Sequence, residues 1–263
     1  MKRKLFLTLT ALVATVVVTI DAQAWGGVGH SAIAYIAEQH LTPKAKEKCN
    51  YYLGNHSLAY FASWQDQWRF IEPFQETTYW HTSQVDAKNG PINNDNGRRA
   101  AYFHVDSLRK DLKNYANQPD SMVAVNLKLM IHMVGDMHCP CHISYPDQGV
   151  KGGSIYRSGK KTKFHTFWDA APGYMHKGWT CEDFHRNLDK LSKKKIAKMS
   201  KGTAADWLRE SGADMREAYA LIPRHSEYTT LPKETRDRAT EICDLQVLRG
   251  AYRLAYVLNE IFK

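Results

Sequence analysis

Residues 232–263 read PKETRDRATEICDLQVLRGAYRLAYVLNEIFK, and this stretch decides the fold class. Its apolar residues recur at steps of three and four, which is the spacing of one face of an α-helix, and Pro232 stands where a helix begins. The residues that share this face are Ile242, Leu245, Leu248, Tyr252, Ala255, Leu258 and Phe262. The stripe predicts a long helix that packs its apolar face into the core.

The same spacing recurs through most of the chain. It predicts helices over residues 30–40, 43–53, 57–70, 106–117, 120–137, 181–198 and 203–221. Strand signal is scarce. We expect a Gly-rich loop over residues 149–164 with a small hairpin turning at Ser158 and Gly159, and a surface loop over residues 90–97. The sequence shows no repeat and no long linker, so it predicts an all-α, single-domain helical bundle over residues 25–263.

The first 24 residues have the pattern of an export signal. Three basic residues precede an apolar run over residues 5–20, and residues 22–24 (AQA) offer small side chains at the cleavage positions. The run is short for a membrane span, and no later stretch of the sequence approaches the length of about 18 apolar residues that a span needs. We expect a mature chain that begins at Trp25, is secreted or periplasmic, and has no stable membrane association.

The sequence has a net charge of +9 at pH 7 and five cysteines. A basic excess can steer a polyanion to the surface, but many basic proteins bind nothing anionic. In an exported chain, five cysteines predict up to two disulfides and one free thiol. Cys139 and Cys141 are separated by one residue, so a bond between them would be strained and each is expected to pair with a distant cysteine.

The clearest chemical signal lies in residues 127–142, LKLMIHMVGDMHCPCH. His132 and Asp136 are four residues apart and therefore lie one turn apart on one helix face, where an imidazole and a carboxylate suit a zinc ion. His142 follows Pro140, which should end the helix, and can turn back toward a neighbouring metal. A single pair of this kind is more often a surface hydrogen bond, so its meaning depends on further ligands.

Three other segments offer such ligands. Residues 164–169 (FHTFWD) repeat the spacing with His165 and Asp169, and residues 63–69 (SWQDQWR) place Asp66 and Arg69 among aromatic residues. The segment WGGVGH at residues 25–30 would follow the cleavage site. Its glycines let the chain end fold back, and a free α-amine and its carbonyl can chelate a metal together. The alternative for this segment is a disordered, glycine-rich terminus.

This ordered set of motifs resembles the S1/P1 nuclease family, whose zinc-dependent members share a distant helical architecture with bacterial phospholipase C. The matching motifs run from residue 25 to residue 169. The resemblance implies three Zn²⁺ ions in a site of nitrogen and carboxylate ligands. The first ion would be held by Asp66, His81, His132 and Asp136; the second by the amine and carbonyl of Trp25 and by His30, with Asp136 shared; the third by His142, His165 and Asp169.

Two of these assignments have competitors. His104 has an aromatic setting like that of His81, but His81 follows Asp66 in the family's order and closes the shorter loop. Arg69 lies one turn beyond Asp66, where it can bind a phosphate or orient the carboxylate by an ion pair; the two roles are compatible. His138 is expected to contact the metal ligands without binding the metal itself.

The sequence departs from the family pattern at two places. Thr82 stands where relatives carry an aromatic residue that stacks a base. Other aromatic side chains could take over that role, since stacking needs only a flat face; the candidates are Tyr79, Trp80, Tyr145 and Tyr156. The thiols of Cys139 and Cys141 are also unusual, and a metal role for them is an alternative to disulfide formation.

The expected function is that of a secreted zinc-dependent endonuclease with Asp66, Arg69 and Asp136 as catalytic residues. It would cut RNA and single-stranded DNA to 5′-phosphate products, with 3′-nucleotidase activity as a further expectation, and no protein partner is implied. One alternative is a zinc phospholipase C, which needs exposed apolar residues around the site. Another is a secreted binding protein in which zinc is a structural staple. Lys160, Lys161 and Lys163 favour a polyanionic substrate, although a solvated hairpin explains them equally well.

Overall fold

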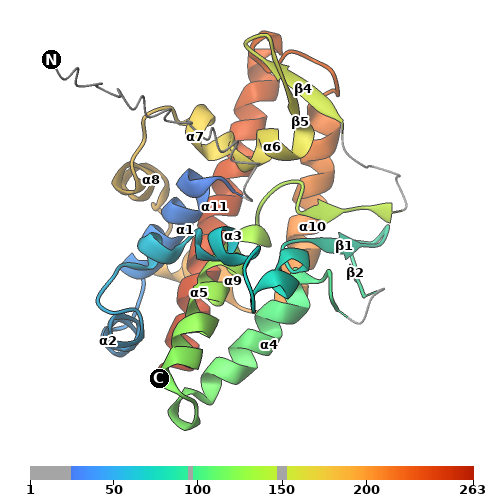
Figure 1. Ribbon diagram of the computed structural model, residues 1–263. Coiled ribbons are helices and arrows are strands. Elements are labelled where there is room, and N and C mark those ends of the chain that lie inside the picture. The colour runs from blue at the N-terminus through green and yellow to red at the C-terminus, as the bar shows by residue number, and fades with distance from the viewer. Residues whose placement is uncertain (1–24, 94–96, 147–152) are drawn as a thin grey trace, which may run out of the picture.

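A computed structural model describes residues 25–93, 97–146 and 153–263. The expected export signal, residues 1–24, lies outside the described residues, as do parts of the two loops expected around residues 90–97 and 149–164. The described chain is mainly helical with two very small sheets, which confirms the predicted all-α class (Figure 1). None of its helices is both long and apolar enough to cross a membrane.

The longest helix, α11 (Lys233–Ile261), forms the centre of the fold and confirms the prediction from the C-terminal stretch. It starts directly after Pro232. The predicted stripe is largely buried, but so are residues on other faces of the helix, including Cys243, Val247 and Arg253. Helix α11 is therefore surrounded by other elements and does not only cover one side of the core.

Four further long helices pack around α11. They are α1 (Gly27–Gln39), α5 (Asp120–Asp136), α4 (Ala101–Lys113) and α10 (Ala204–Leu221). Helices α1 and α5 both contact α11 and each other, whereas α10 bridges α4 and α11. Shorter helices cover the periphery: α2 (Pro43–Tyr52), α7 (Ala171–Met175), α8 (Cys181–Leu188) and α9 (Lys193–Ser200). This arrangement places the C-terminal end of α5 beside the start of α1.

Two predicted helices are interrupted. The segment 57–70 forms a 3₁₀ turn, η1 (Leu58–Phe61), and a separate short helix, α3 (Trp64–Trp68). The segment 181–198 divides into α8 and α9 because the Ser192 hydroxyl accepts a hydrogen bond from the backbone N–H of Lys195 and so caps a new helix. Two short helices are not predicted by the sequence pattern: α6 (Phe164–Asp169) and α7.

The strands position two loops. The predicted hairpin exists as β4 (Ser154–Arg157) and β5 (Lys160–Lys163), with positive φ at both Ser158 and Gly159, as a tight two-residue turn requires. A small sheet that was not predicted has the order β2-β1-β3, from β1 (Ser83–Val85), β2 (Pro91–Ile92) and β3 (Ile143–Ser144). Strand β1 is parallel to β3, and this pairing brings the loop before residue 83 beside the turn after α5.

The predicted disulfides are absent. All five cysteines lie within the described residues, and all are free thiols. Cys49, Cys139 and Cys243 are buried in α2, in the turn after α5 and in α11, and each is packed separately in the apolar core. The Cys139 thiol donates to the carboxylate of Asp169, while the Cys141 thiol faces the backbone carbonyl of Phe164. The prediction failed because pairing depends on how the elements pack, which cysteine spacing does not encode.

Candidate metal centre

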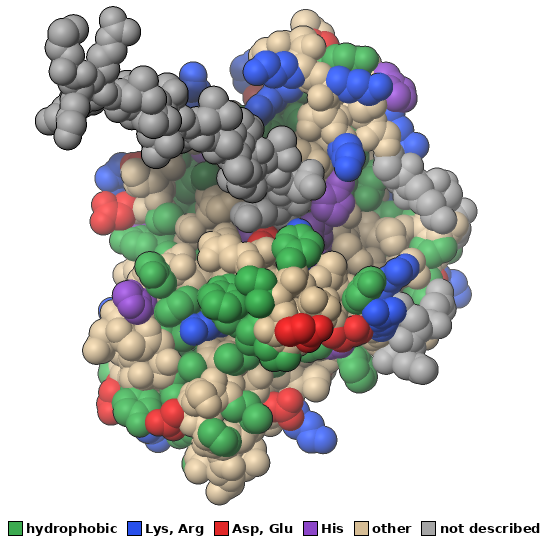
Figure 2. All heavy atoms as spheres, viewed as in Figure 1, with side chains coloured by type: hydrophobic (Ala, Val, Ile, Leu, Met, Phe, Trp, Pro, Cys, Tyr) green, Lys and Arg blue, Asp and Glu red, His purple; other side chains and the backbone are tan. Residues whose placement is uncertain are grey.

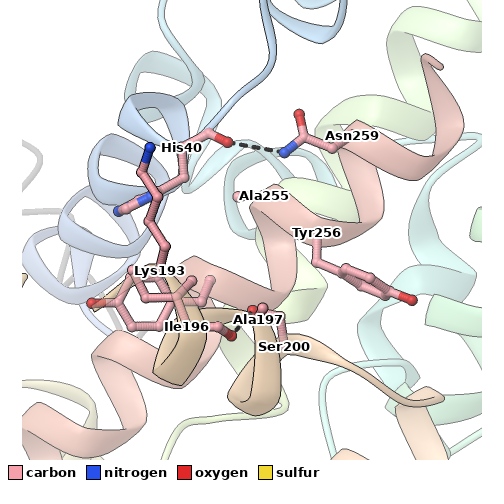
Figure 3. A pocket seen from close by; sticks show the side chains of 9 residues that line it. His40, Lys193, Ile196, Ala197, Ser200, Ala255, Tyr256 and Asn259 are labelled. Atoms are coloured by element: carbon pink, nitrogen blue, oxygen red, sulfur yellow. Dashed lines mark hydrogen bonds between the residues drawn. The ribbon is translucent and has the colours of Figure 1, made fainter. Parts of the chain in front are cut away.

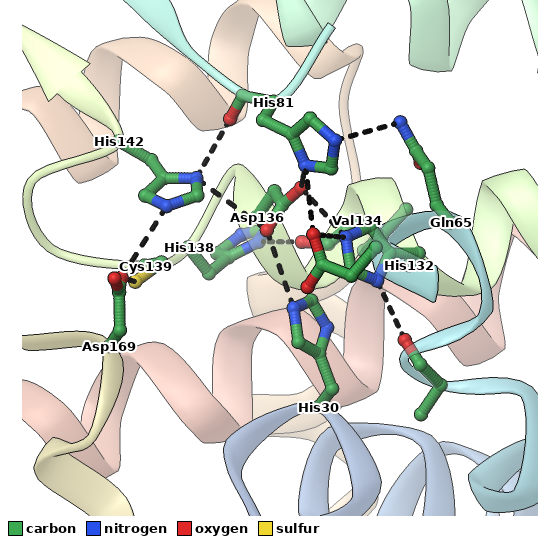
Figure 4. Close-up of polar contacts among 12 residues, drawn as sticks. His30, Gln65, His81, His132, Val134, Asp136, His138, Cys139, His142 and Asp169 are labelled. Carbon is green, nitrogen blue, oxygen red and sulfur yellow. Dashed lines mark hydrogen bonds and ion pairs between the residues drawn. The ribbon is translucent and has the colours of Figure 1, made fainter. Parts of the chain in front are cut away.

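One buried point of the fold collects side chains from four separate elements (Figure 4). Helix α1 contributes His30, α3 contributes Asp66, the loop before β1 contributes His81, and α5 contributes His132 and Asp136. All five are buried. We call this group the α5 cluster.

Asp136 is the centre of the α5 cluster. Its Oδ2 lies 2.6 Å from Nδ1 of His81 and 3.2 Å from Nε2 of His132, and its Oδ1 lies 3.3 Å from Nε2 of His30. The rings of His30 and His132 are stacked with centroids 4.1 Å apart. One carboxylate is therefore shared by three imidazoles, and its two oxygens face different histidines.

Asp66 and Arg69 complete this side of the centre. Asp66 Oδ1 lies 3.8 Å from His132 Nε2 and 4.0 Å from His81 Nδ1. Arg69 forms an ion pair with the same oxygen at 3.2 Å, its guanidinium lies 5.0 Å from the ring centroid of Phe70, and its Nε is buried without a hydrogen-bond partner. The expected ion pair with Asp66 is thus present, and Arg69 still has donor capacity for a ligand.

A second group, the α6 cluster, adjoins the first and consists of His142, His165 and Asp169. His142 Nε2 lies 3.5 Å from Asp169 Oδ1, and His165 Nε2 lies 3.4 Å from Asp169 Oδ2. His142 also lies 3.5 Å from Asp136 Oδ1, so it links the two clusters. The side chain of His165 is 40% exposed, which opens the α6 cluster to solvent.

Backbone carbonyls fix the tautomers of two histidines. His132 donates from Nδ1 to the Ala62 carbonyl at 2.8 Å, and His142 donates from Nδ1 to the His81 carbonyl at 2.8 Å. When such an imidazole is neutral, its Nε2 carries no proton, and the lone pair of this nitrogen points into the clusters. Such backing from the far ring nitrogen is typical of metal-bound histidine.

The clusters contain buried polar atoms that no hydrogen bond satisfies. They include Nε2 of His132 and of His142, both ring nitrogens of His30, both carboxylate oxygens of Asp66, Asp136 Oδ1 and Asp169 Oδ2. Buried polar atoms normally have partners, and several unpaired lone pairs that converge are costly without a cation. Imidazole nitrogen and carboxylate oxygen without thiolate suit hydrolytic Zn²⁺. The residues present therefore fit a metal centre. Two groups of histidine and aspartate in the α5 cluster lie close enough to hold a metal ion, and a third close group consists of His142 and Asp169 with Cys139.

The pKa values of the histidines in the α5 cluster shift in different directions. Burial lowers the pKa of His30, with a further contribution from His132, and burial lowers the pKa of His81. Burial also disfavours protonated His132, but the carboxylates of Asp136 and Asp66 outweigh it and raise its pKa to about 9. Burial alone would raise the pKa of Asp136; the surrounding histidines reverse this and hold it well below its usual value. In the metal-free protein, a proton on His132 thus offsets part of the negative charge.

Cys139 lies beside the α6 cluster but is poorly suited to bind metal. Burial, together with the nearby Asp169 carboxylate, raises the pKa of this thiol well above its usual value. The protonated thiol donates to Asp169 Oδ1 at 3.4 Å. Cys139 therefore orients a carboxylate, a role that the sequence did not indicate.

The start of the described chain reaches both clusters. The indole of Trp25 is fully buried, and the backbone N–H of Gly26 donates to the Asp169 carbonyl at 2.6 Å. Gly135 allows the close approach of α1, because a Cβ at this position would lie 2.6 Å from Nδ1 of His30. The WGGVGH segment is thus held at the centre and begins α1 there.

The other histidines considered lie elsewhere. His104 stacks on Trp80 and donates to the Arg98 carbonyl, so His81 and not His104 lies in the α5 cluster. His138 was expected to support the ligands, which is wrong: its Nδ1 donates to the Val134 carbonyl and its Nε2 accepts from Arg253. Gln65 is the residue that contacts a cluster histidine, because its side-chain amide nitrogen lies 3.4 Å from His81 Nε2. The only feature of the sequence that could have indicated a place for Gln65 near the site is its position between Trp64 and Asp66.

The surface near the centre combines apolar and basic side chains. Three apolar side chains next to Arg69 are exposed: Trp68, Phe70 and Ile71, of which Phe70 is 66% exposed. Figure 2 shows hydrophobic side chains gathered over this part of the molecule. Lys and Arg side chains gather over the β4–β5 hairpin in the same view, and histidine surface is visible between the two regions.

The candidate stacking residues differ in availability. Tyr145 is buried and donates to the Gly212 carbonyl, so it cannot serve as a platform. The guanidinium of Arg98 covers one face of the Tyr79 ring. Trp80 is likewise stacked on His104.

A separate cavity of about 280 Å³ lies between the end of α1, α9 and α11 (Figure 3). His40, Lys193 and Tyr256 are among the residues that line it, and the side chain of Asn259 donates to the His40 carbonyl across it. None of its lining residues belongs to the α5 or α6 cluster, so the chemistry described above does not extend into it.

Comparison with known proteins agrees with this geometry. The model of the S1/P1 nuclease family matches residues 25–263. Nuclease P1 of Penicillium citrinum is 24% identical over 281 aligned residues, which cover 90% of this chain and 97% of that protein. Nuclease S1 of Aspergillus oryzae is 27% identical over 165 residues, and the alignment spans 57% of each chain. Endonuclease 4 of Arabidopsis thaliana is 25% identical over 164 residues, and that match spans 55% of the plant protein.

The family match includes both clusters and Trp25, and it extends through α11 to the end of the sequence. It therefore accounts for the helical framework as well as for the side chains that the framework brings together. This chain belongs to the S1/P1 nuclease family.

Proposed function

We propose that this chain is an exported zinc-dependent nuclease that hydrolyses phosphodiester bonds of RNA and single-stranded DNA to 5′-phosphate products. Removal of 3′-phosphates from nucleotides belongs to the same proposal. The observation that carries it is the convergence of the α5 and α6 clusters, whose imidazoles and carboxylates include several buried polar atoms without hydrogen-bond partners. The names of the relatives, which are nucleases, support the same class of reaction.

The proposed ligands are those of the two clusters. Asp66, His81, His132 and Asp136 would hold one ion; His30 and the amine and carbonyl of Trp25 would hold a second that shares Asp136; the α6 cluster would hold a third. Zinc bound in this way lowers the pKa of a bound water so that hydroxide is available near neutral pH. The geometry of Asp136 supports sharing, since its two oxygens face different histidines.

Arg69 and Asp66 have roles that do not depend on the number of ions. The unpaired Nε of Arg69 and its remaining guanidinium hydrogens can donate to the non-bridging oxygens of a phosphate, whose negative charge they stabilise. Asp66 holds this guanidinium in place by the 3.2 Å ion pair and can accept a hydrogen bond from the attacking water. Both residues are therefore proposed as catalytic, together with Asp136.

A nucleic-acid substrate is favoured over a phospholipid by what surrounds the clusters. The exposed ring of Phe70 adjoins Arg69, and such a pairing of a flat aromatic face with a phosphate-binding cation suits a single-stranded nucleotide. The exposed Trp68, Phe70 and Ile71 would also suit a lipid surface, so phospholipase activity is the second candidate. The basic hairpin on the other side of the histidines favours the polyanion.

The test is to purify protein that begins at Trp25, measure zinc per chain by elemental analysis, and assay one sample on single-stranded RNA, single-stranded DNA and phosphatidylcholine vesicles. We expect about three zinc ions per chain and nucleic-acid cleavage that a chelator abolishes. Cleavage of the vesicles alone would move the chain to the phospholipase class. Bound zinc with neither activity would identify the metal as structural.

A further inference from the structure

A second cavity lies beside the α6 cluster, between the β4–β5 hairpin and helices α6 and α7. It has a volume of about 270 Å³. Three cationic residues of the hairpin are among those that line it, together with Thr162 and Thr166. The cations are Arg157, Lys160 and Lys161. We call this the hairpin cavity.

The cations of the hairpin cavity have no counterion among the described residues. The nearby carboxylate of Glu227 is already used, because it accepts hydrogen bonds from the backbone N–H groups of Ser158 and Gly159 at 2.9 Å each. The guanidinium of Arg157 lies 4.6 Å from the ring centroid of Tyr174, which also lines the cavity. Arg157 is thus held at the wall by a cation–π contact and keeps its hydrogen-bond donors available.

Helix α6 connects the hairpin cavity to the metal centre. Thr166 and Ala170 line the cavity, and they directly follow His165 and Asp169 in the sequence. Successive residues on a helix are about 100° apart, so the same two turns present the α6 cluster on one face and the cavity wall on the next. A strand bound at the cluster therefore passes within reach of the cavity.

We propose that the hairpin cavity binds a phosphate group of the single-stranded substrate other than the phosphate that is cleaved. Three unpaired cations with hydroxyl donors and no lining carboxylate select a phosphate over other ligand classes. The inference rests on the proposed function and adds to it: long strands gain a contact that a dinucleotide cannot make. Lys160 and Lys161 are binding residues here and take no part in the chemical step.

The test compares a Lys160→Ala/Lys161→Ala double variant with a Lys46→Ala/Lys194→Ala control, which removes the same charge from exposed positions on α2 and α9. Binding of a phosphorothioate dT12, which keeps its charges and resists hydrolysis, is measured by fluorescence anisotropy on the zinc-loaded protein over a range of salt concentrations. KM and kcat are measured for dT12 and for the dinucleotide dTpdT.

We expect the cavity variant to bind dT12 about tenfold more weakly at low salt, and the slope of log K against log salt to shrink by about 0.7, which is the contribution of one lost phosphate contact for a single strand. KM for dT12 rises while kcat and all values for dTpdT stay like those of the control. Equal loss in both double variants, or an equal loss on dTpdT, overturns the proposal. If the wild-type protein binds dT12 through these lysines but does not cut ordinary single strands, the cavity stands and the proposed function fails.

Discussion

His132 Nε2 and Asp136 Oδ2 lie 3.2 Å apart on one face of α5, and the far nitrogen of the same imidazole is bound to the Ala62 carbonyl. The imidazole is therefore fixed by its Nδ1 while its Nε2 faces the carboxylate. Helix α1, helix α3 and the loop before β1 each place one further side chain next to this pair.

Asp136→Asn should remove activity and most of the metal. The amide keeps the shape but loses the negative charge that the surrounding histidines stabilise. We expect nuclease activity to fall on the order of a thousandfold, as is typical when a metal-held hydroxide is lost. Zinc per chain and kcat are measured beside Asp120→Asn, a control at the exposed start of the same helix. Full activity in Asp136→Asn would remove this residue from the mechanism.

Zinc binding should release protons near neutral pH. In the metal-free protein the pKa of His132 is raised to about 9, so the imidazole is protonated at pH 7.5, whereas a bound metal requires it neutral. Because protons compete with zinc for this nitrogen, the apparent zinc affinity falls as the pH is lowered below about 9. Calorimetry in two buffers of different ionisation enthalpy counts the protons released. Equal heats in both buffers would show that His132 is already neutral.

Gly135→Ala should displace His30 without weakening the helix. A Cβ at residue 135 would lie 2.6 Å from Nδ1 of His30 and 2.9 Å from its Cε1. Alanine favours a helix over glycine by about 1 kcal/mol, so the metal-free protein should not lose helical stability. We expect zinc affinity and activity to fall by at least about tenfold, as when a ligand is misoriented. Gly173→Ala, whose Cβ would make only an ordinary contact with Val28, is the matched control.

One additional residue before Trp25 should impair the centre. Trp25 is fully buried, and the Gly26 amide next to it is bound to the Asp169 carbonyl. An extra alanine converts the proposed α-amine ligand into an amide, which binds metal far less readily, so we expect about one zinc ion fewer per chain and most of the activity lost. Zinc content and kcat are compared with protein that begins at Trp25. Equal values for the two proteins would exclude the amine as a ligand.

The sequence predicted the parts of the site that depend on local spacing. The His132 and Asp136 pair follows from helical periodicity alone, and the turn that brings back His142 follows from Pro140. By contrast, His81 comes beside the turn after α5 through the parallel pairing of β1 with β3, and those strands are about 60 residues apart. Register between such distant segments is a property of packing.

Elements that were missed are short or depend on neighbours. Helix α6 has six residues, too few to show a helical period, and its His165 and Asp169 were found from their spacing and not from a predicted helix. The split between α8 and α9 depends on the Ser192 cap, a single residue that periodicity does not weigh. The predicted disulfides failed for the same general reason, since thiols that are distant in sequence meet only if the helices place them together.

The free thiols change what can hold this fold together. Ligands from α1, α3, the loop before β1, α5 and α6 lie up to about 140 residues apart in sequence, so metal bound to them would cross-link the chain as disulfides do in many secreted proteins. Such a cross-link is reversible and depends on free metal concentration. Metal scarcity would then make the protein fragile and prone to proteolysis as well as inactive, so that metal supply would determine its lifetime.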